Sequence, residues 1–161
     1  YSVGVGCFGF WNESSGVRRS NSSSNRNFTI VAGSPRYNES GAVFFLPFSK
    51  SRTATDFDTL PLYNDYFKLV GTETFASTFG YSLVVLDIDR NRYDDLLVGA
   101  PHYYEANPSK TIGGAVFVYF ATGSNPENND EVFHKPIVLF GRNSFGTSLT
   151  SLGDLNQDGF N

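Results

Sequence analysis

The hydrophobic positions of the chain fall in short, continuous runs that are separated by polar, turn-rich segments. In the middle of the chain these runs occupy residues 82–87, 96–99, 115–120 and 136–140. Continuous apolar runs of this length predict strands whose sheet is covered on both faces, because a half-exposed sheet would alternate apolar and polar residues. Segments 105–113 and 123–130 are rich in turn residues and predict loops. Since no segment shows a sustained helical period with caps, the pattern predicts an all-β fold.

The same pattern recurs along the chain. Phe-Gly-Tyr-Ser-Leu at 79–83 returns as Phe-Gly-Thr-Ser-Leu 66 positions later, at 145–149, and Val-Ala-Gly-Ser-Pro at 31–35 anticipates Val-Gly-Ala-Pro at 98–101. Four short strands per repeat, in repeats that must stack to bury both faces, predict β-propeller blades of four antiparallel strands. We expect three repeats: 1–78, which lacks its own first residues; 79–144, which is complete; and 145–161, the start of a third.

Composition narrows the class of protein without changing this picture. Phe and Tyr account for 16 and 9 of the 161 residues, Gly for 16, and Met is absent, which favours strands and turns over helices. The net charge of −4 is accompanied by no basic cluster, so neither nucleic acid nor a lipid surface is an expected partner. No stretch is long and apolar enough to span a bilayer, so any membrane span is expected outside this segment.

The segment 87–95, Asp-Ile-Asp-Arg-Asn-Arg-Tyr-Asp-Asp, joins two expected strands and predicts a calcium site. Side chains at positions 1, 3 and 5 of a tight loop can converge on one point, and a carbonyl at position 7 and a carboxylate at position 9 complete the oxygen shell that calcium prefers. Those positions hold Asp87, Asp89, Asn91, the C=O of Tyr93, and Asp95. The absence of His and Cys from this set disfavours softer metals. Because the carboxylates would otherwise repel one another, calcium should fasten the hairpin.

Two other kinds of structure could account for this acidic segment. An EF-hand needs Gly at position 6 and Glu at position 12, where this loop has Arg92 and Val98, and residues 96–99 continue as a strand. An ordinary acidic surface turn is disfavoured because the pattern recurs in register with the repeat. The side chains of Arg90, Arg92 and Asp94 fall on even positions, so we expect them to point away from the ion into solvent.

The recurrence of the loop supplies a second candidate site. It offers Asp154, Asn156, Asp158 and the C=O of Phe160. The ninth position would be residue 162, so we expect the natural chain to continue beyond Asn161 with the missing ligand.

The first repeat departs from the pattern. Cys7 stands where the loop would have its first Asp, and 26 positions separate it from Gly33, against 12 between Asp87 and Gly99. The additional residues, within 8–27, are rich in Ser and Asn and predict an exposed insertion. We therefore expect no calcium site in the first repeat.

The remaining reactive or modifiable residues favour an extracellular binding protein over an enzyme. Cys7 is the single cysteine, so it is either a buried thiol or the partner of a cysteine outside this segment. His102 and His134 are isolated from any nucleophile or carboxylate pattern, and no phosphate-binding loop is present. Four Asn-X-Ser/Thr sequons cluster within residues 12–40 and indicate glycosylation: Asn12, Asn21, Asn27 and Asn38.

Three of these motifs together carry a family resemblance. Phe79-Gly80, the Asp-x-Asp-x-Asn-x-Tyr-x-Asp loop at 87–95, and Gly-Ala-Pro at 99–101 resemble the FG-GAP repeat of integrin α subunits, and the segment from Phe145 onward resembles the next repeat. The resemblance implies a middle portion of a seven-bladed β-propeller, comprising a third blade, a fourth and the start of a fifth.

The resemblance also implies function. Such a propeller docks onto a β subunit, and the pair binds extracellular-matrix or cell-surface ligands, with calcium loops on the face away from the ligand. It implies a single-pass cell-surface protein whose span lies outside this segment. An aromatic residue just after Phe-Gly lines the contact with the β subunit, which implies Tyr1 and Tyr81, although both could equally pack in the first strand's core. Thr147 lacks the aromatic ring. The alternative of a different class is the FG-GAP propeller of a secreted enzyme, such as a glycosylphosphatidylinositol-specific phospholipase D.

Overall fold

The computed structural model describes residues 2–9, 28–47, 66–71, 74–104, 113–124 and 131–159. These residues form two antiparallel sheets of four strands each, and the strands of each sheet are paired in chain order. The strands of the first sheet are β1 (Ser2–Gly6), β2 (Thr29–Ser34), β3 (Ala42–Pro47) and β4 (Phe67–Val70), and those of the second are β5 (Ser82–Leu86), β6 (Asp95–Ala100), β7 (Ala115–Tyr119) and β8 (Ile137–Phe140). The prediction of an all-β fold made of four-stranded antiparallel units is confirmed.

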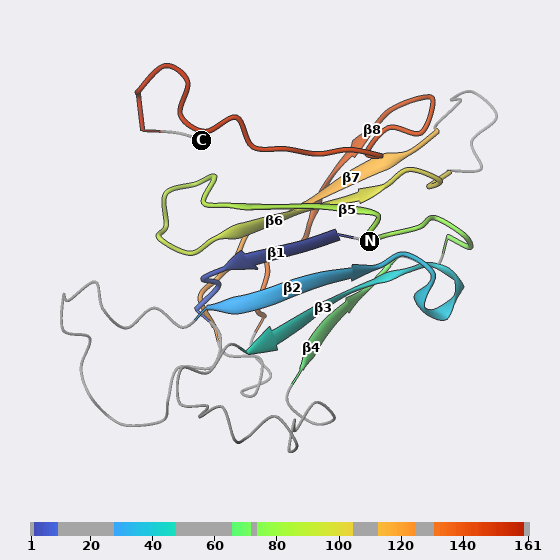
Figure 1. The fold of residues 1–161 in the computed structure, drawn as a ribbon, viewed down its shortest axis with the longest axis horizontal. Coiled ribbons are helices and arrows are strands. Elements are labelled where there is room, and N and C mark those ends of the chain that lie inside the picture. Colours follow the sequence, from blue (N-terminus) through green and yellow to red (C-terminus); the bar gives the residue numbers. More distant parts are fainter. Residues whose placement is uncertain are drawn as a thin grey trace.

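The two sheets are placed side by side, with their first strands adjacent (Figure 1). β1 packs against β5, while β4 and β8 lie at the far edges of their sheets. Helical structure in the described ranges is confined to a single 3-10 turn at Tyr37–Glu39 between β2 and β3. No helix within those ranges is long and apolar enough to cross a membrane.

Burial explains why the strands read as continuous apolar runs. Every residue of β7 is buried, on both faces of the sheet. β8, at the edge, is more open, with Ile137 at 55% exposure. The predicted strand at 96–99 is longer in the structure, because β6 begins at Asp95, the last residue of the expected metal loop.

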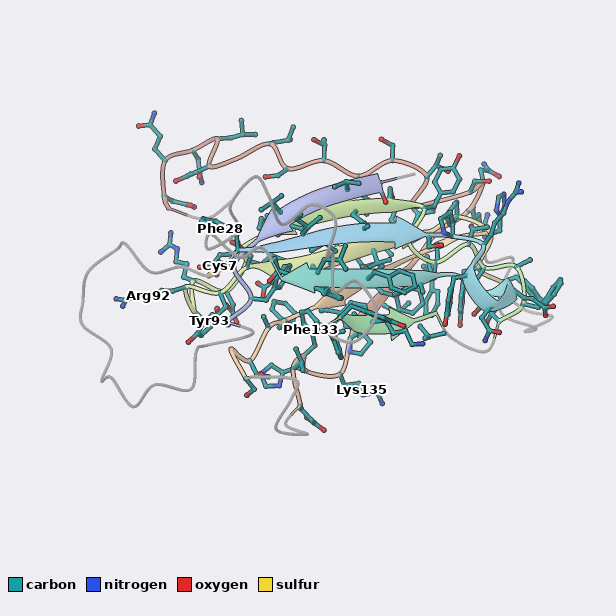
Figure 2. All side chains as sticks on the ribbon, turned by 60° about the horizontal axis from the view of Figure 1, so that its bottom comes forward. Cys7, Phe28, Arg92, Tyr93, Phe133 and Lys135 are labelled. Carbon is teal, nitrogen blue, oxygen red and sulfur yellow. The ribbon has the colours of Figure 1, made fainter. Side chains whose placement is uncertain are left out.

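An aromatic cluster joins the two sheets. The ring of Phe133, which precedes β8, lies 5.6 Å from the ring of Phe45 in β3 and 5.7 Å from that of Tyr119 in β7. Phe8, just after β1, completes the cluster with an edge contact of 5.4 Å to Phe45. Figure 2 shows Phe133 among the side chains between the sheets. The core is therefore shared between the two units, and neither sheet buries its apolar surface alone.

A Phe-Gly pair holds the chain to each sheet as it leaves, at Phe79-Gly80 and at Phe145-Gly146, and this contact is called the latch. The chain leaving the first sheet forms a parallel bridge between Gly41 and Phe79, and the chain leaving the second forms the equivalent bridge between Gly114 and Phe145. In both places the Phe N–H donates a 3.0 Å hydrogen bond to the preceding sheet, to the C=O of Ser40 and of Gly113 respectively. The Phe-Gly pair thus holds the departing chain to the sheet that it leaves in the same way twice.

The glycine of each Gly-x-Pro turn, Gly33 or Gly99, is needed where the latch passes close to the preceding sheet. A Cβ at Gly99 would overlap the backbone oxygen of Gly146 and the hydroxyl of Ser82, and a Cβ at Gly33 would overlap the oxygen of Gly80 and the hydroxyl of Ser2. The hydroxyls of Ser2 and Ser82 donate to those same glycine oxygens, at 3.1 and 2.7 Å. The glycine therefore recurs in both repeats for a steric reason, and the serine recurs because its hydroxyl donates a hydrogen bond to the latch.

Candidate metal centre

The three carboxylates predicted to bind a metal converge in the structure. Asp87, Asp89 and Asp95 each bring a carboxylate oxygen within 4.8 Å of the others. Asp87 follows β5, Asp95 opens β6, and these strands are paired through Leu86 and Asp95. The hairpin register therefore sets the first and last carboxylates of the loop beside each other, and the turn between them returns Asp89 to the same point.

Asp95 is the fully buried member of the cluster, with 0% exposure. Its two oxygens accept backbone hydrogen bonds from Ile88 at 2.8 Å and from Ala121 at 2.9 Å. Burial raises the pKa of Asp95, these two N–H groups oppose that rise, and the charges of Asp89 and Asp87 add to it. Charge at this position is costly unless a cation compensates it.

Asp87 has a buried carboxylate oxygen without a partner in the described residues, and this oxygen tests whether a cation would fit. One oxygen accepts the Arg92 N–H at 3.0 Å. The other, Oδ1, is buried and has no hydrogen-bond partner within the described part of the chain. A carboxylate oxygen left in this state loses its hydration without compensation. Because Asp87 also belongs to the three-carboxylate cluster, the residues present fit a hard cation with oxygen ligands.

The middle of the loop is shaped by its own side chains. Asp89 accepts the Asn91 N–H at 3.0 Å, and the Asn91 side-chain oxygen accepts the Tyr93 N–H at 2.8 Å. An amide oxygen has two lone pairs, so this bond leaves one on Asn91 for a ligand. Arg90 and Arg92, between these positions, adopt positive φ values of 63° and 76°. The alternation turns successive odd-numbered side chains toward one side of the loop.

The second candidate loop has the same backbone form. Gln157 and Gly159, which correspond to Arg90 and Arg92, have φ values of 57° and 87°. Asp154 accepts the Gly159 N–H at 2.6 Å, the counterpart of the Asp87–Arg92 bond. Asn156 donates to Asp158 at 2.7 Å. Asp154, Asn156 and Asp158 therefore lie in a loop shaped like the first, whereas Phe160 lies outside the described residues.

The expectation that Asp94 points into solvent is wrong. Its Oδ2 accepts the N–H of Cys7 at 2.6 Å, and its own N–H donates to the C=O of Cys7 at 2.9 Å. The pair of bonds joins the metal loop to the end of β1 in the first sheet. Cys7 lies beside the loop in Figure 2, and its thiol is buried, at 8% exposure.

Arg90 is exposed, as expected, but it is also bonded outside its own loop. Its guanidinium turns to the second loop and donates to the C=O of Gly159, at 2.8 Å from Nε, and to the C=O of Asp158. The physical reason is the array, since this even position of the first loop faces the neighbouring loop. Arg92 is exposed, as predicted, and Figure 2 shows it pointing outward from the sheets.

One contribution to the site carries no sequence signal. Ala121, which follows β7, donates its N–H to Asp95 and accepts from the Asn91 side chain at 2.9 Å. A backbone group of an alanine is invisible to motif reasoning. For Arg90 a signal does exist, because the loop that it reaches has Gly159 at the position that the guanidinium approaches.

The other predicted site residues are placed as follows. Asn38 is exposed, in the 3-10 turn, with φ 44°. Tyr81 is 37% exposed and donates its N–H to Gly99 at 3.1 Å. Outside the described residues lie Tyr1, Asn12, Asn21 and Asn27.

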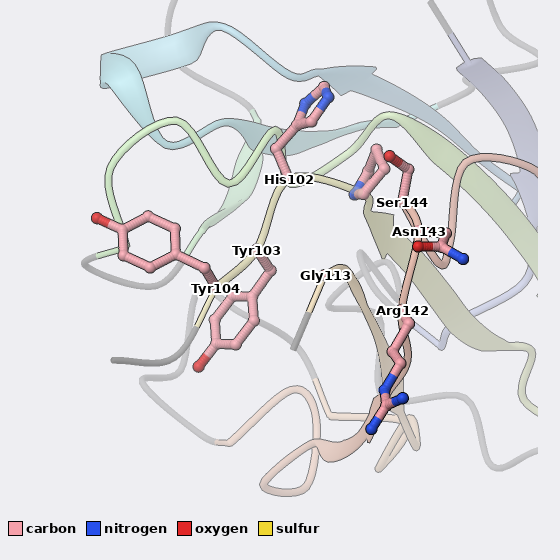
Figure 3. Close-up of a pocket in the computed structure, with 8 residues that line it drawn as sticks. His102, Tyr103, Tyr104, Gly113, Arg142, Asn143 and Ser144 are labelled. Carbon is pink, nitrogen blue, oxygen red and sulfur yellow. The ribbon is translucent and has the colours of Figure 1, made fainter. Parts of the chain in front are cut away.

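An open cleft of about 580 Å³ lies at the opposite end of the second sheet (Figure 3). Its lining residues come from the two segments that follow β6 and β8 and from Gly113: Pro101, His102, Tyr103, Tyr104, Arg142, Asn143 and Ser144. β6 runs from the metal loop at Asp95 to this cleft just beyond Ala100. The His102 ring nitrogen lies 3.1 Å from the Thr78 hydroxyl, and His134 is an exposed residue whose N–H pairs with Phe120. Neither histidine belongs to the carboxylate cluster.

Comparison with known proteins agrees with the repeat. The FG-GAP repeat model matches residues 79–119. The chain is 37% identical over 163 residues to Integrin alpha ina-1 of Caenorhabditis elegans, which covers 98% of this chain and 13% of that protein. It is 37% identical to Integrin alpha-3 of Mus musculus and 35% identical to Integrin alpha-6 of Homo sapiens, in each case over 134 residues and 82% of this chain.

The chain spans 13% or less of the length of these relatives. The likeness nevertheless runs through both sheets, and the FG-GAP match covers the metal loop and the strands on either side of it. The Phe-Gly latch, the acidic hairpin loop and the Gly-Ala-Pro turn are all present in the structure. By these features the chain belongs to the integrin α family and carries its FG-GAP repeat.

Proposed function

We propose that this chain forms part of the β-propeller of a cell-surface integrin α subunit. Such a subunit would pair with an integrin β subunit and bind extracellular-matrix or cell-surface protein ligands. The observation that carries the proposal is the match to an integrin α chain over 98% of this sequence. Since integrin α chains are not enzymes, no catalytic activity is assigned. The membrane span would lie outside these residues, with the blades on the extracellular side.

The exposed apolar side chains support a larger propeller. Val3 on β1 is 72% exposed, and Leu152 and Leu155, after the second latch, are 72% and 76% exposed. Neighbouring blades of a propeller would cover such side chains, because stacked repeats bury their faces against one another. We propose repeat boundaries at 1–78, 79–144 and 145–161, which set each Phe-Gly latch at the start of a blade.

We propose that the loop at 87–95 binds Ca²⁺ through Asp87, Asp89, Asn91, the C=O of Tyr93, and Asp95. The orphaned oxygen of Asp87 and the burial of Asp95 support this assignment. When bound, calcium would supply the positive charge that three neighbouring carboxylates require. The loop would then hold β5 and β6 in register through ligands at both of its ends.

We propose a second calcium loop with Asp154, Asn156, Asp158 and the C=O of Phe160 as ligands. Its backbone form, matched to the first loop at Gln157 and Gly159, supports it. Glycosylation is proposed at Asn38, whose side chain is exposed, and from the sequons alone at Asn12, Asn21 and Asn27. Contact with the β subunit is proposed for Tyr81, and by analogy for Tyr1.

Two measurements test these proposals. The full-length protein should co-purify with a β subunit from the same cells, and failure with every β subunit of the source organism would refute the receptor assignment. Calorimetric titration of the full-length protein should detect calcium sites with Kd on the order of 10⁻⁴–10⁻³ M, the usual range for extracellular sites. Asp89→Ala should remove one site, and an unchanged stoichiometry would exclude the loop at 87–95.

A further inference from the structure

We infer that the two calcium loops are energetically coupled, and that Arg90 is the positioning residue that couples them. The inference rests on the proposed calcium function, and adds that filling the loop at 87–95 strengthens binding at the loop that begins with Asp154. The observation behind it is that the side chain of one loop is bonded to the backbone of the other. Sites linked in this way share a coupling free energy and affect each other reciprocally.

The contact is specific in geometry. The planar guanidinium of Arg90 donates to two successive carbonyls, those of Asp158 and Gly159. A fork of fixed N–H groups is suited to two acceptors held at a set spacing. A Cβ at Gly159 would overlap the Arg90 guanidinium, and the φ of 87° at this residue also favours glycine. Gly159 therefore gives the second loop its turn and gives Arg90 room to reach it.

The bonded peptide leads directly to a proposed ligand. The peptide unit between Asp158 and Gly159 accepts from Arg90 through its C=O and donates through its N–H to Asp154, at 2.6 Å. Asp154 also accepts the N–H of Asp158 at 3.0 Å. Because the peptide is planar, fixing its oxygen side fixes the direction of its N–H. Arg90 thereby orients the Asp154 carboxylate through one rigid unit.

The other end of the relay is anchored in the first loop. Arg90 lies between two bonds that involve proposed ligands, Asn91 N–H to Asp89 and Arg92 N–H to Asp87, both 3.0 Å long. Its backbone adopts φ 63°, a conformation that a non-glycine residue keeps only when its surroundings enforce it. A first loop ordered by calcium would hold Arg90 in place, whereas an unfilled loop with three repelling carboxylates would release it.

Charge repulsion between two filled loops would oppose this coupling. At physiological ionic strength the Debye length is about 8 Å, so repulsion between exposed charges beyond that distance is largely screened. The Arg90 bonds act at contact distance and are not weakened in the same way. We therefore expect positive coupling of about fivefold, the lower end of the range for linked sites, because Arg90 is exposed.

Hydrogen–deuterium exchange of the full-length protein, titrated with calcium in 0.15 M salt, tests the coupling site by site. The readout is the calcium concentration at which the backbone amides of residues 154–159 become half protected. Arg90→Ala and Asp89→Ala should each raise that concentration about fivefold, and the double variant should raise it no further. Asp154→Ala should raise the midpoint for residues 87–95 by the same factor, as reciprocity requires.

The matched control is Arg92→Ala. Arg92 is an exposed arginine of the same loop with the same sign of φ, and within the described ranges no hydrogen bond joins its side chain to the second loop. This variant should shift the calcium midpoint of residues 154–159 by less than about twofold. Any such shift would arise only from the change in the net charge of the loop. Protection of β7 should be unchanged in all variants, which verifies folding.

The outcomes separate the two proposals. Independent midpoints, unmoved by Arg90→Ala, would overturn the coupling while leaving both calcium sites intact. An Arg90→Lys variant that behaves like the wild type would overturn the two-donor relay, since lysine keeps the charge and loses the fork. If calcium changes protection of neither loop, both the calcium assignment and the coupling fail.

Discussion

The two sheets have the same topology and the same latch, but only the second has an acidic loop in the described part of its first hairpin. Ser2 faces Gly33 in the first sheet and Ser82 faces Gly99 in the second, in the same register. Where the second sheet continues from β5 into Asp87, the first continues from β1 into Cys7. Within the described residues, both sheets therefore form with the same strand order and the same latch, while an acidic loop is seen only in the second sheet.

The end of β1 in the first sheet contacts the acidic loop of the second sheet. The backbone of Cys7 exchanges two hydrogen bonds with Asp94, a residue of the acidic loop of the second sheet. The ring of Tyr93, from the same loop, packs against Gly9, which lies two residues after Cys7. One loop therefore supports the ends of the first strands of both sheets, and its order should affect both.

The largest effect is expected from filling the latch in either sheet. Gly99→Ala and Gly33→Ala should each lower the free energy of unfolding by about 3 kcal/mol, the upper range for overpacking, because the obstructing atoms include backbone. Equal losses would show that the latch does the same work in both sheets. Chemical denaturation of the full-length protein measures the change.

Gly153→Ala is the control for this pair. A Cβ at Gly153 meets nothing within 4 Å, although its φ of 69° carries the ordinary penalty for a side chain. Its loss should be about 1 kcal/mol. A Gly33 variant as mild as Gly153→Ala would break the equivalence of the two latches.

Calcium removal should have the next largest effect, and it should affect the two sheets to different degrees. A ligand at ten times its Kd stabilises the folded state by about 1.4 kcal/mol per site. Chelation should therefore speed amide exchange most in β5 and β6, less in β1 through Cys7 and Asp94, and least in β3 and β4. Equal loss of protection across β3 and β6 would contradict a site confined to the second sheet.

Asp94→Asn should loosen the contact between the sheets. The substitution keeps the shape and one acceptor, but it replaces a charged acceptor of the Cys7 N–H with a neutral one, and charge-assisted bonds are about twice as strong. We expect a loss of about 1 kcal/mol, with faster exchange at the Cys7 amide. Arg92→Ala, in the same loop, should leave that amide unchanged.

Strand positions, repeat spacing and the converging carboxylates could all be predicted from the sequence, because each rests on local pattern. Apolar runs place β5 to β8 within about a residue of their observed ends, and a period of 66 residues relates the two latches. The rule that side chains at odd positions of the loop converge predicted that Asp87, Asp89 and Asp95 lie close together, as they do.

The contacts between units could not be predicted in the same way. The even-position rule predicts only that Arg90 and Asp94 point away from an ion, and it says nothing about what lies on that side. In an array, the neighbouring blade lies on that side. A side chain that would face solvent in an isolated loop therefore contacts the next blade here. Residue 121 supports the loop through its backbone alone, and no side-chain pattern could have indicated that.

The smallest expected effect concerns the serine of each latch. Ser82 is buried and donates to Gly146 at 2.7 Å, whereas the bond from Ser2 to Gly80 is 3.1 Å long and only partly buried. Ser82→Ala leaves a buried carbonyl short of a donor and should cost about 1 kcal/mol, while Ser2→Ala should cost about 0.5 kcal/mol because water can replace the hydroxyl. Thermal unfolding of both variants measures the difference. A larger loss at Ser2 would mean that burial in the complete propeller reverses the order, and that the first latch is the more enclosed of the two.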